Sequence, residues 1–331
     1  MFGGVLARQV VAACAAVLLS LPAAPLARAA DRIRIAAQKT GTLSWELEII
    51  RSHGLDKKAD LDLQVVELAS PEAGKIALRG GSADLIVSDW LWVARERAMG
   101  DKLVFYPYSS QIGAIMVPAD SAIADPADLK GRKLAVAGGP LDKSWLMLQA
   151  DARRDGVDLK KETTIVYGAP PLLSEKALQH EHDATLTYWN FCAELEGKGM
   201  KRGIDMEAVE RRLGASGPVA MLGYVFDARW AARTRTAVAR FLAITAEAKD
   251  ILANSPEEWR RLSTRIGISD SAGLDIYRRR YREGIPHRPV ADEERDAIGL
   301  YRVLAAAGGS ELVGPAREMD QGTFYDPEKT D

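Results

Sequence analysis

Short apolar runs alternate along the chain with helical patterns, and this alternation is the feature that most limits the fold. The run RIRIAAQ (residues 32–38) predicts a strand, and LSWELEIIRSHG (43–54) predicts a helix. The same order continues through LDLQVVELA (61–69), PEAGKIALRGG (71–81) and ADLIVSD (83–89). A βαβαβα order predicts an α/β protein with a parallel sheet covered by helices.

The pattern begins again in the middle of the chain. Residues 133–137 predict a strand, which a helix and two further strands follow. The run GPVAMLGYVF (217–226) predicts a strand that returns from this second unit, and from Ala228 on the chain is mostly helical. We therefore predict two lobes joined by crossovers near residues 111–118 and 219–226. The predicted boundaries are 31–115 and 227–331 for the first lobe, and 116–226 for the second.

Two stretches of the sequence echo one another, as expected if the two lobes are copies of one plan. Each has a helix, a tight turn, an aspartate and a strand with an aromatic residue at its carboxyl end. The first series is Ala77, Leu78, Gly81 and Asp84, before a strand that ends at Asp89-Trp90. The second is Ala177, Leu178 and Asp183, before a strand that ends at Tyr188-Trp189.

The first thirty residues predict export from the cytoplasm. Arg8 precedes the apolar run VVAACAAVLLSLPAAPL (10–26), which ends at Ala27-Arg28-Ala29-Ala30, a small-x-small cleavage signature. We interpret residues 1–30 as a secretory signal peptide, with a single membrane anchor as the alternative. The mature protein is then expected in the periplasm.

Charge and cysteine content exclude some partners and some sources of stability. The 331-residue chain has 44 basic and 46 acidic residues, a net charge of −2, and no basic block that would indicate nucleic acid. Beyond Cys14, in the leader, only Cys192 remains, so no intrachain disulfide can form. Stability must come from packing, and we expect a monomer.

Three stretches together carry a family resemblance. They are ALRGGSADLIVSD (77–89), DLKGRKLAVAGG (128–139) and ATLTYWNF (184–191). With the leader, they resemble the periplasmic solute-binding proteins of ABC importers, in the branch that binds aliphatic sulfonates, taurine and thiamine precursors. The first-lobe pattern of that family, Ala-Leu-x-x-Gly-x-x-Asp, is met in full. In the second lobe Glu181 stands where a glycine is usual, and the spacing to Asp183 is one residue short.

The resemblance implies a type II-like periplasmic-binding-protein fold, with a small-molecule ligand held in a cleft between two hinged lobes. It also implies delivery of that ligand to an ABC permease in the inner membrane, with no catalytic cofactor. In open α/β sheets, ligands lie outside the carboxyl ends of strands, where helix N-termini present N–H groups. Four such corners are readable, and five of the seven tryptophans lie at them. The predicted ligand-binding residues are Lys39, Thr40, Thr42, Trp45, Ser88, Asp89, Trp90, Trp92, Gly139, Lys143, Ser144, Trp145, Tyr188, Trp189 and Asn190.

The ligand class follows from these residue types. Tryptophans would stack on a flat ligand, and Lys39 and Lys143 would attract an anion, so we expect a planar anionic heteroaromatic such as pyrroloquinoline quinone. If a helix begins at Trp90, however, Trp90 and Trp92 point to opposite sides and only one reaches the ligand. Taurine or another aliphatic sulfonate, and a thiamine-type pyrimidine, are the alternatives.

Enzymatic and signalling roles are the competing function classes. GASGP (214–218) is not a Gly-x-Ser-x-Gly nucleophile elbow. His180 and His182, two residues apart in a loop, do not have the spacing of a zinc helix, so we predict no catalytic or metal site. A binding protein that serves a membrane sensor would look the same in sequence as one that serves a permease.

Overall fold

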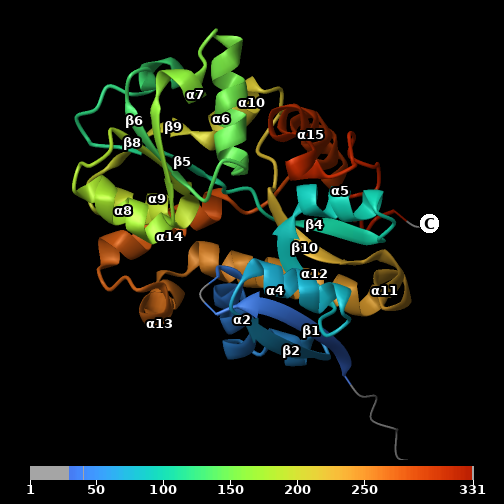
Figure 1. The fold of residues 1–331 in the computed structure, drawn as a ribbon. Coiled ribbons are helices and arrows are strands. Elements are labelled where there is room, and N and C mark those ends of the chain that lie inside the picture. The colour runs from blue at the N-terminus through green and yellow to red at the C-terminus, as the bar shows by residue number, and fades with distance from the viewer. Residues whose placement is uncertain (1–29, 40, 330–331) are drawn as a thin grey trace, which may run out of the picture. The chain divides into compact units, whose positions relative to one another are not determined.

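The computed structural model describes residues 30–39 and 41–329, and these contain two five-stranded sheets (Figure 1). The sheet of the first lobe has the order β2-β1-β3-β10-β4, and that of the second lobe β7-β6-β8-β5-β9. The first-lobe strands are β1 (Asp31–Gln38), β2 (Leu61–Leu68), β3 (Leu85–Asp89), β4 (Leu103–Ser109) and β10 (Leu222–Asp227). The second-lobe strands are β5 (Gly113–Val117), β6 (Lys133–Ala137), β7 (Thr164–Gly168), β8 (Ala184–Tyr188) and β9 (Lys201–Asp205). The predicted two-lobed α/β fold class is confirmed. The proposed signal peptide (1–30) lies almost wholly outside the described residues.

Each sheet contains one antiparallel strand, which the prediction of parallel sheets missed. β10 is antiparallel to β3 and β4, and β5 is antiparallel to β8 and β9. Both are the strands by which the chain enters one lobe from the other. The two sheets therefore have the same plan, with the entering strand fourth in each order.

The crossovers lie between these strands. The chain leaves the first sheet at Ser109 and begins β5 at Gly113, and it returns between helix α10 (Met206–Arg212) and Leu222. The predicted boundary at 115/116 thus falls inside β5, and the one at 226/227 falls inside β10. Gly113 is required at the first crossover: its φ is +143°, and a Cβ there would lie 2.0 Å from the carbonyl oxygen of Thr187.

Helices cover both sheets (Figure 1). The helices of the first half are α2 (Leu43–Ser52), α3 (Leu55–Lys58), α4 (Pro71–Arg79), α5 (Trp90–Ala98) and α6 (Lys143–Arg154), with a 3₁₀ turn at Pro126–Leu129. The next three are α7 (Leu159–Glu162), α8 (Pro170–Leu178) and α9 (Trp189–Gly197). After α10 come α11 (Ala228–Arg233), α12 (Arg235–Asn254), α13 (Pro256–Ile266), α14 (Ser271–Glu283) and α15 (Val290–Val313). The sequence pattern did not predict α3, α7, β9 or α10, which are short.

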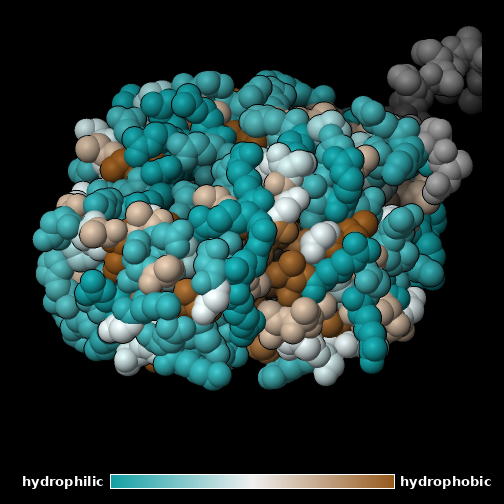
Figure 2. All heavy atoms as spheres, turned by 90° about the horizontal axis from the view of Figure 1, so that it is seen from above, coloured by the Kyte–Doolittle hydropathy of each residue, from teal (hydrophilic) through white to brown (hydrophobic). Residues whose placement is uncertain are grey.

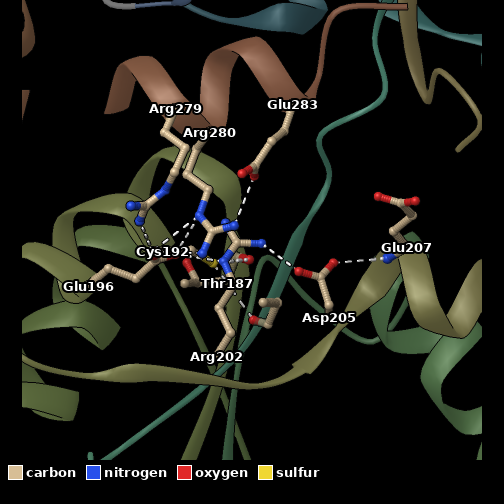
Figure 3. Close-up of polar contacts among 10 residues, drawn as sticks. Thr187, Cys192, Glu196, Arg202, Asp205, Glu207, Arg279, Arg280 and Glu283 are labelled. Atoms are coloured by element: carbon tan, nitrogen blue, oxygen red, sulfur yellow. Dashed lines mark hydrogen bonds and ion pairs between the residues drawn. The ribbon is translucent and has the colours of Figure 1, made fainter. Parts of the chain in front are cut away.

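The C-terminal helices do not all return to the first lobe, as the boundary 227–331 implied. Helix α12 packs on α2 of the first lobe, but α14 packs on α9 of the second lobe, and α15 packs both on α6 of the second lobe and on α5 of the first. Figure 3 shows the ion pairs that hold α14 there. Glu196 of α9 accepts hydrogen bonds from Arg280 (2.8 Å), from Arg279 (3.3 Å) and from Arg202 of β9 (2.6 Å). Helix α14 is therefore a third connection between the lobes.

Most apolar side chains lie inside these layers. The face in Figure 2 is largely hydrophilic, and hydrophobic residues are visible there mainly in furrows. Within residues 30–39 and 41–329, the helices fall short of the length and apolarity that a bilayer crossing requires.

Candidate functional site

A cavity of about 520 Å³ lies between the two lobes, and we call it the cleft cavity. Its walls come from the carboxyl ends of β1 and β3 in the first lobe and of β8 in the second, with the first turns of helices α2, α4, α6 and α9. Gln111 and Met221 of the two crossovers complete it. The volume suits a small organic molecule.

Several helix N-termini face this cavity, and they differ in how their N–H groups are satisfied. Asp89 caps α5, Asp142 caps α6 and Ser70 caps α4, each accepting a backbone N–H with its side chain. Helices α2 and α9 have no side-chain cap at their N-cap residues, Thr42 and Tyr188. In α2 the N–H groups of Ser44 and Trp45 already donate to the backbone oxygens of Gly41 and Thr42. The helix dipole favours negative charge at both starts, which are therefore suited to an anion.

An ion pair joins the lobes across the cavity. Lys143, the first residue of α6, donates a hydrogen bond of 3.0 Å from Nζ to Oδ2 of Asp89, at the end of β3. Burial alone would raise the pKa of Asp89, but Lys143, the N–H of Trp92 and Lys75 together lower it. Asp89 in turn raises the pKa of Lys143 despite its burial. Both groups are therefore charged at neutral pH, and Lys143 is already paired.

The second-lobe wall holds a further carboxyl group. Burial raises the pKa of Asp142, which also bonds to the hydroxyl of Tyr188. Burial raises the pKa of Tyr188 to about 12, so its hydroxyl stays protonated. Gly138 makes room for this contact: its φ is +87°, and a Cβ there would lie 3.0 Å from the Tyr188 hydroxyl. The cavity thus offers both hydrogen-bond donors and carboxyl acceptors.

Comparisons with known proteins agree with this architecture. A model of the NMT1/THI5-like family matches residues 51–259, more than half of the chain. The chain belongs to the NMT1/THI5-like family. This bears out the sequence resemblance to the sulfonate- and thiamine-precursor-binding branch. No curated protein sequence matches the chain.

Solved structures share the fold of this NMT1/THI5-like protein at low sequence identity. The periplasmic aliphatic sulphonate binding protein SsuA from Escherichia coli aligns over 91% of this chain and 96% of its own, with a TM-score of 0.69 and 21% identity. The alkanesulfonate-binding protein SsuA from Xanthomonas axonopodis pv. citri, bound to MOPS, aligns over 89% and 98%, with a TM-score of 0.66 and 18% identity. The desulfurization enzyme DSZB aligns over 86% and 94%, with a TM-score of 0.56 and 14% identity.

Eight of the fifteen predicted site residues line the cleft cavity. These are Thr42, Ser88, Asp89, Lys143, Ser144, Tyr188, Trp189 and Asn190. Lys39 is exposed outside it, Gly139 is not in its wall, and Thr40 lies outside the described residues. The corner predictions therefore located the cavity.

Most of the predicted tryptophans are packing residues, which corrects the expected stacking surface. Trp45, Trp90 and Trp145 are buried in the core and do not line the cavity. Trp92 also lies outside the cavity wall, half-buried with Lys75 Nζ 5.4 Å from its ring centre. The reason for Trp90 is packing: as the first residue of α5 it lies in the core, where its ring packs against Tyr301 of α15. Trp189 does line the cavity, but it is only 6% exposed, and its ring packs against Trp45, Tyr277 and Tyr281.

The sequence reading missed one complete corner. Strand β2 ends at Leu68, and Ser70, Glu72 and Lys75 then line the cavity from the start of α4. The signal was present, since Pro71 in a first helical turn follows a strand there. Gln111 was harder to find, because a crossover residue follows no sequence pattern.

The one cysteine among the described residues is a packing residue. Cys192 of α9 is fully buried, and its Sγ lies 3.3 Å from the carbonyl oxygen of Thr187 (Figure 3). Burial raises the pKa of this thiol to about 12. A thiol that stays protonated and has no access to solvent is a poor nucleophile.

Proposed function

We propose that this protein is a periplasmic solute-binding protein that captures a small molecule in the cleft cavity and delivers it to an ABC import permease. The observation that carries the proposal is a cavity of about 520 Å³ lined from both lobes. Ligand contacts in both lobes favour the closed state over the open state, and a permease would recognise this closed, ligand-bound form. The family, the fold shared with two SsuA proteins and the export-like leader support the same role.

We propose that the ligand carries one anionic group and a hydrogen-bond donor or cation. The anionic group would lie at the uncapped starts of α2 and α9, near Thr42 and Tyr188. The donor would meet the carboxyl groups of Asp89 and Asp142. An aminosulfonate such as taurine has this combination, and the MOPS bound by the Xanthomonas protein is likewise an aminosulfonate.

Pyrroloquinoline quinone is the second candidate, because the exposed ring of Tyr188 gives the cavity one aromatic face. Its support is weaker than the sequence suggested. Three carboxylates would enter a cavity that already holds Glu72, Asp89 and Asp142, against Lys75 and a Lys143 engaged with Asp89. A polyanion would therefore need both lysines released from their present contacts.

Mass spectrometry of the small molecule that copurifies from the native host tests the ligand class. Calorimetric titration with taurine, a thiamine-type pyrimidine and pyrroloquinoline quinone then ranks the candidates. We expect saturable binding of an aminosulfonate and its recovery unchanged. Turnover of any ligand would indicate an enzyme, and a deletion strain with normal uptake but altered gene expression would indicate a sensor partner.

A further inference from the structure

A second, much smaller pocket lies directly behind the cleft cavity. This inner pocket has a volume of about 10 Å³, and Thr42, Gln111 and Trp189 line both it and the cleft cavity. On the other side it is closed by the end of α14, where a Cβ on Gly284 would come within 2.4 Å of Gln111 Cγ. Its volume is about that needed for one water molecule.

A buried lysine reaches this pocket. Lys249 of α12 forms an ion pair with Glu46 of α2 and donates a hydrogen bond of 2.9 Å to the hydroxyl of Tyr224. Its Nζ lies 4.3 Å from the ring centre of Tyr108, on the pocket wall. An ammonium group has three donors, and these two contacts use two of them. Lys249 lines the inner pocket and Glu46 does not, so the positive member of the pair is the one in the pocket wall.

A buried tyrosine with an unpartnered hydroxyl also lines this pocket. Tyr281 of α14 is 8% exposed, lines the pocket, and has no hydrogen-bond partner for its hydroxyl among the described residues. Leaving a buried hydroxyl unpaired is costly, so such a group is normally satisfied by protein or by ordered water. Thr42 adds a third polar group, since its Oγ1 accepts from the Tyr108 hydroxyl (3.0 Å) and keeps its own hydrogen free to donate.

We propose that the inner pocket holds one ordered water, bound by Lys249, Tyr281 and Thr42, which donates a hydrogen bond to the anionic group of the ligand. The inference rests on the proposed function and assigns the α2 side of the cleft cavity to that group. Lys249 does not line the cleft cavity, so it cannot contact the ligand directly, and the water links it to the anionic group through hydrogen bonds. It thereby favours an anion over a neutral group of the same shape.

Two variants and one control test this site. Tyr281→Phe removes only the unpartnered hydroxyl of this lining residue. Lys249→Met combined with Glu46→Gln removes the charge without leaving a buried carboxylate unpaired. Tyr277→Phe is the control, because Tyr277 lies one helical turn before Tyr281 and, like it, packs against Trp189, but lines neither cavity.

Crystal structures without ligand and calorimetry with taurine and pyrroloquinoline quinone provide the readouts. We expect a density peak within hydrogen-bond distance of Lys249 Nζ and Tyr281 Oη, lost in Tyr281→Phe. The ligand that binds should bind about fivefold more weakly to Tyr281→Phe and at least tenfold more weakly to the charge variant, with Tyr277→Phe unchanged. If the native protein binds neither ligand, the proposed ligand class is contradicted. If it binds one and Tyr281→Phe binds it equally well, or if the pocket shows no density, the inner-pocket site is wrong.

Discussion

The two lobes of this protein share one strand order but not one chemistry at the corners that face the cleft. Strand β3 ends at Asp89, whose side chain caps α5 and pairs with Lys143. Strand β8, at the corresponding place, ends at Tyr188, which leaves the start of α9 uncapped. Topology thus fixes where helix N-termini meet the cavity, and the residue at the strand end decides whether the N-terminus is satisfied within the protein or left for a ligand.

The largest expected effect contrasts the two tryptophans that open these helices. Trp90→Ala should cost about 3–5 kcal/mol of unfolding free energy, because the ring is fully buried and its loss leaves a cavity in the core. Trp189→Ala should cost about 2 kcal/mol, since water can enter from the adjoining cleft cavity. Only the second variant should weaken ligand binding, by about tenfold. Denaturant unfolding and calorimetry measure both, and equal losses of stability would show that the two corners are packed alike.

The next contrast concerns the aspartate repeated in both lobes. Asp84 accepts the backbone N–H of Arg34 (2.8 Å) and forms a two-point ion pair with its guanidinium. Asp183 accepts the backbone N–H of Lys133 (2.7 Å), but its contact with Arg132 is 4.0 Å long and more exposed. Each aspartate thus joins the start of one strand to the backbone of the neighbouring strand, β3 to β1 in the first lobe and β8 to β6 in the second.

Alanine at the two positions should therefore have unequal effects. Asp84→Ala should cost about 2–3 kcal/mol, because a charge-assisted network is lost, and Asp183→Ala about 1 kcal/mol. Urea unfolding of both variants in the same buffer checks the order. A larger loss at Asp183 would mean that the backbone hydrogen bond, and not the ion pair, is the main contribution.

The two carboxyl caps in the cavity should respond to pH in opposite directions. The folded-state pKa of Asp89 is lowered, so the ionised carboxylate stabilises the fold fully above about pH 4, the pKa of an aspartate in the unfolded chain. This stabilisation is lost as the pH falls through the lowered folded-state pKa. Burial raises the pKa of Asp142, so its ionised form costs stability above the folded pKa and this cost disappears at lower pH.

At pH 7, Asp89→Asn should therefore lose about 1–2 kcal/mol, whereas Asp142→Asn, which can still cap α6, should gain a few tenths. The Asp142→Asn difference from the native protein should shrink toward pH 4, whereas the Asp89→Asn difference should persist to about pH 4 and shrink only below it. Urea unfolding at pH 7, at pH 4 and at a lower pH provides the measurement. Asp89→Asn also frees Lys143, so an anionic ligand should bind it more tightly, and weaker binding would show that the carboxylate contacts the ligand directly.

The sequence predicted the plan of the fold better than the roles of side chains. Alternating runs predicted residues 133–137 as a strand, and β6 has these bounds, because hydrophobic periodicity reports which face of an element is buried. The same logic placed Trp90 just after a strand end and Trp145 in the first turn of the next helix, but it could not tell which way a first-turn side chain points. Asp89 and Lys143 were both predicted for the site, yet their mutual ion pair depends on how the lobes meet. Such a contact joins residues with no relation in the sequence.

The smallest expected effect comes from the turn that precedes each repeated aspartate. Gly81 has a φ of +70° after α4, and His180 has a φ of +57° after α8, so both occupy the left-handed region. The sequence comparison had placed Glu181 at the glycine position, but the structure aligns His180 with Gly81, and the spacing to the aspartate is then equal.

A side chain at positive φ costs about 1 kcal/mol relative to glycine. His180→Gly should therefore stabilise the protein by up to about 1 kcal/mol, reduced by the greater freedom of glycine in the unfolded chain. Gly81→Ala should destabilise it by a similar amount, since open space around Gly81 leaves backbone strain as the only cost. Thermal unfolding of the two variants decides the matter. A loss of stability in His180→Gly would show that the imidazole makes contacts that outweigh the strain, and that the second lobe has replaced the glycine for a structural reason.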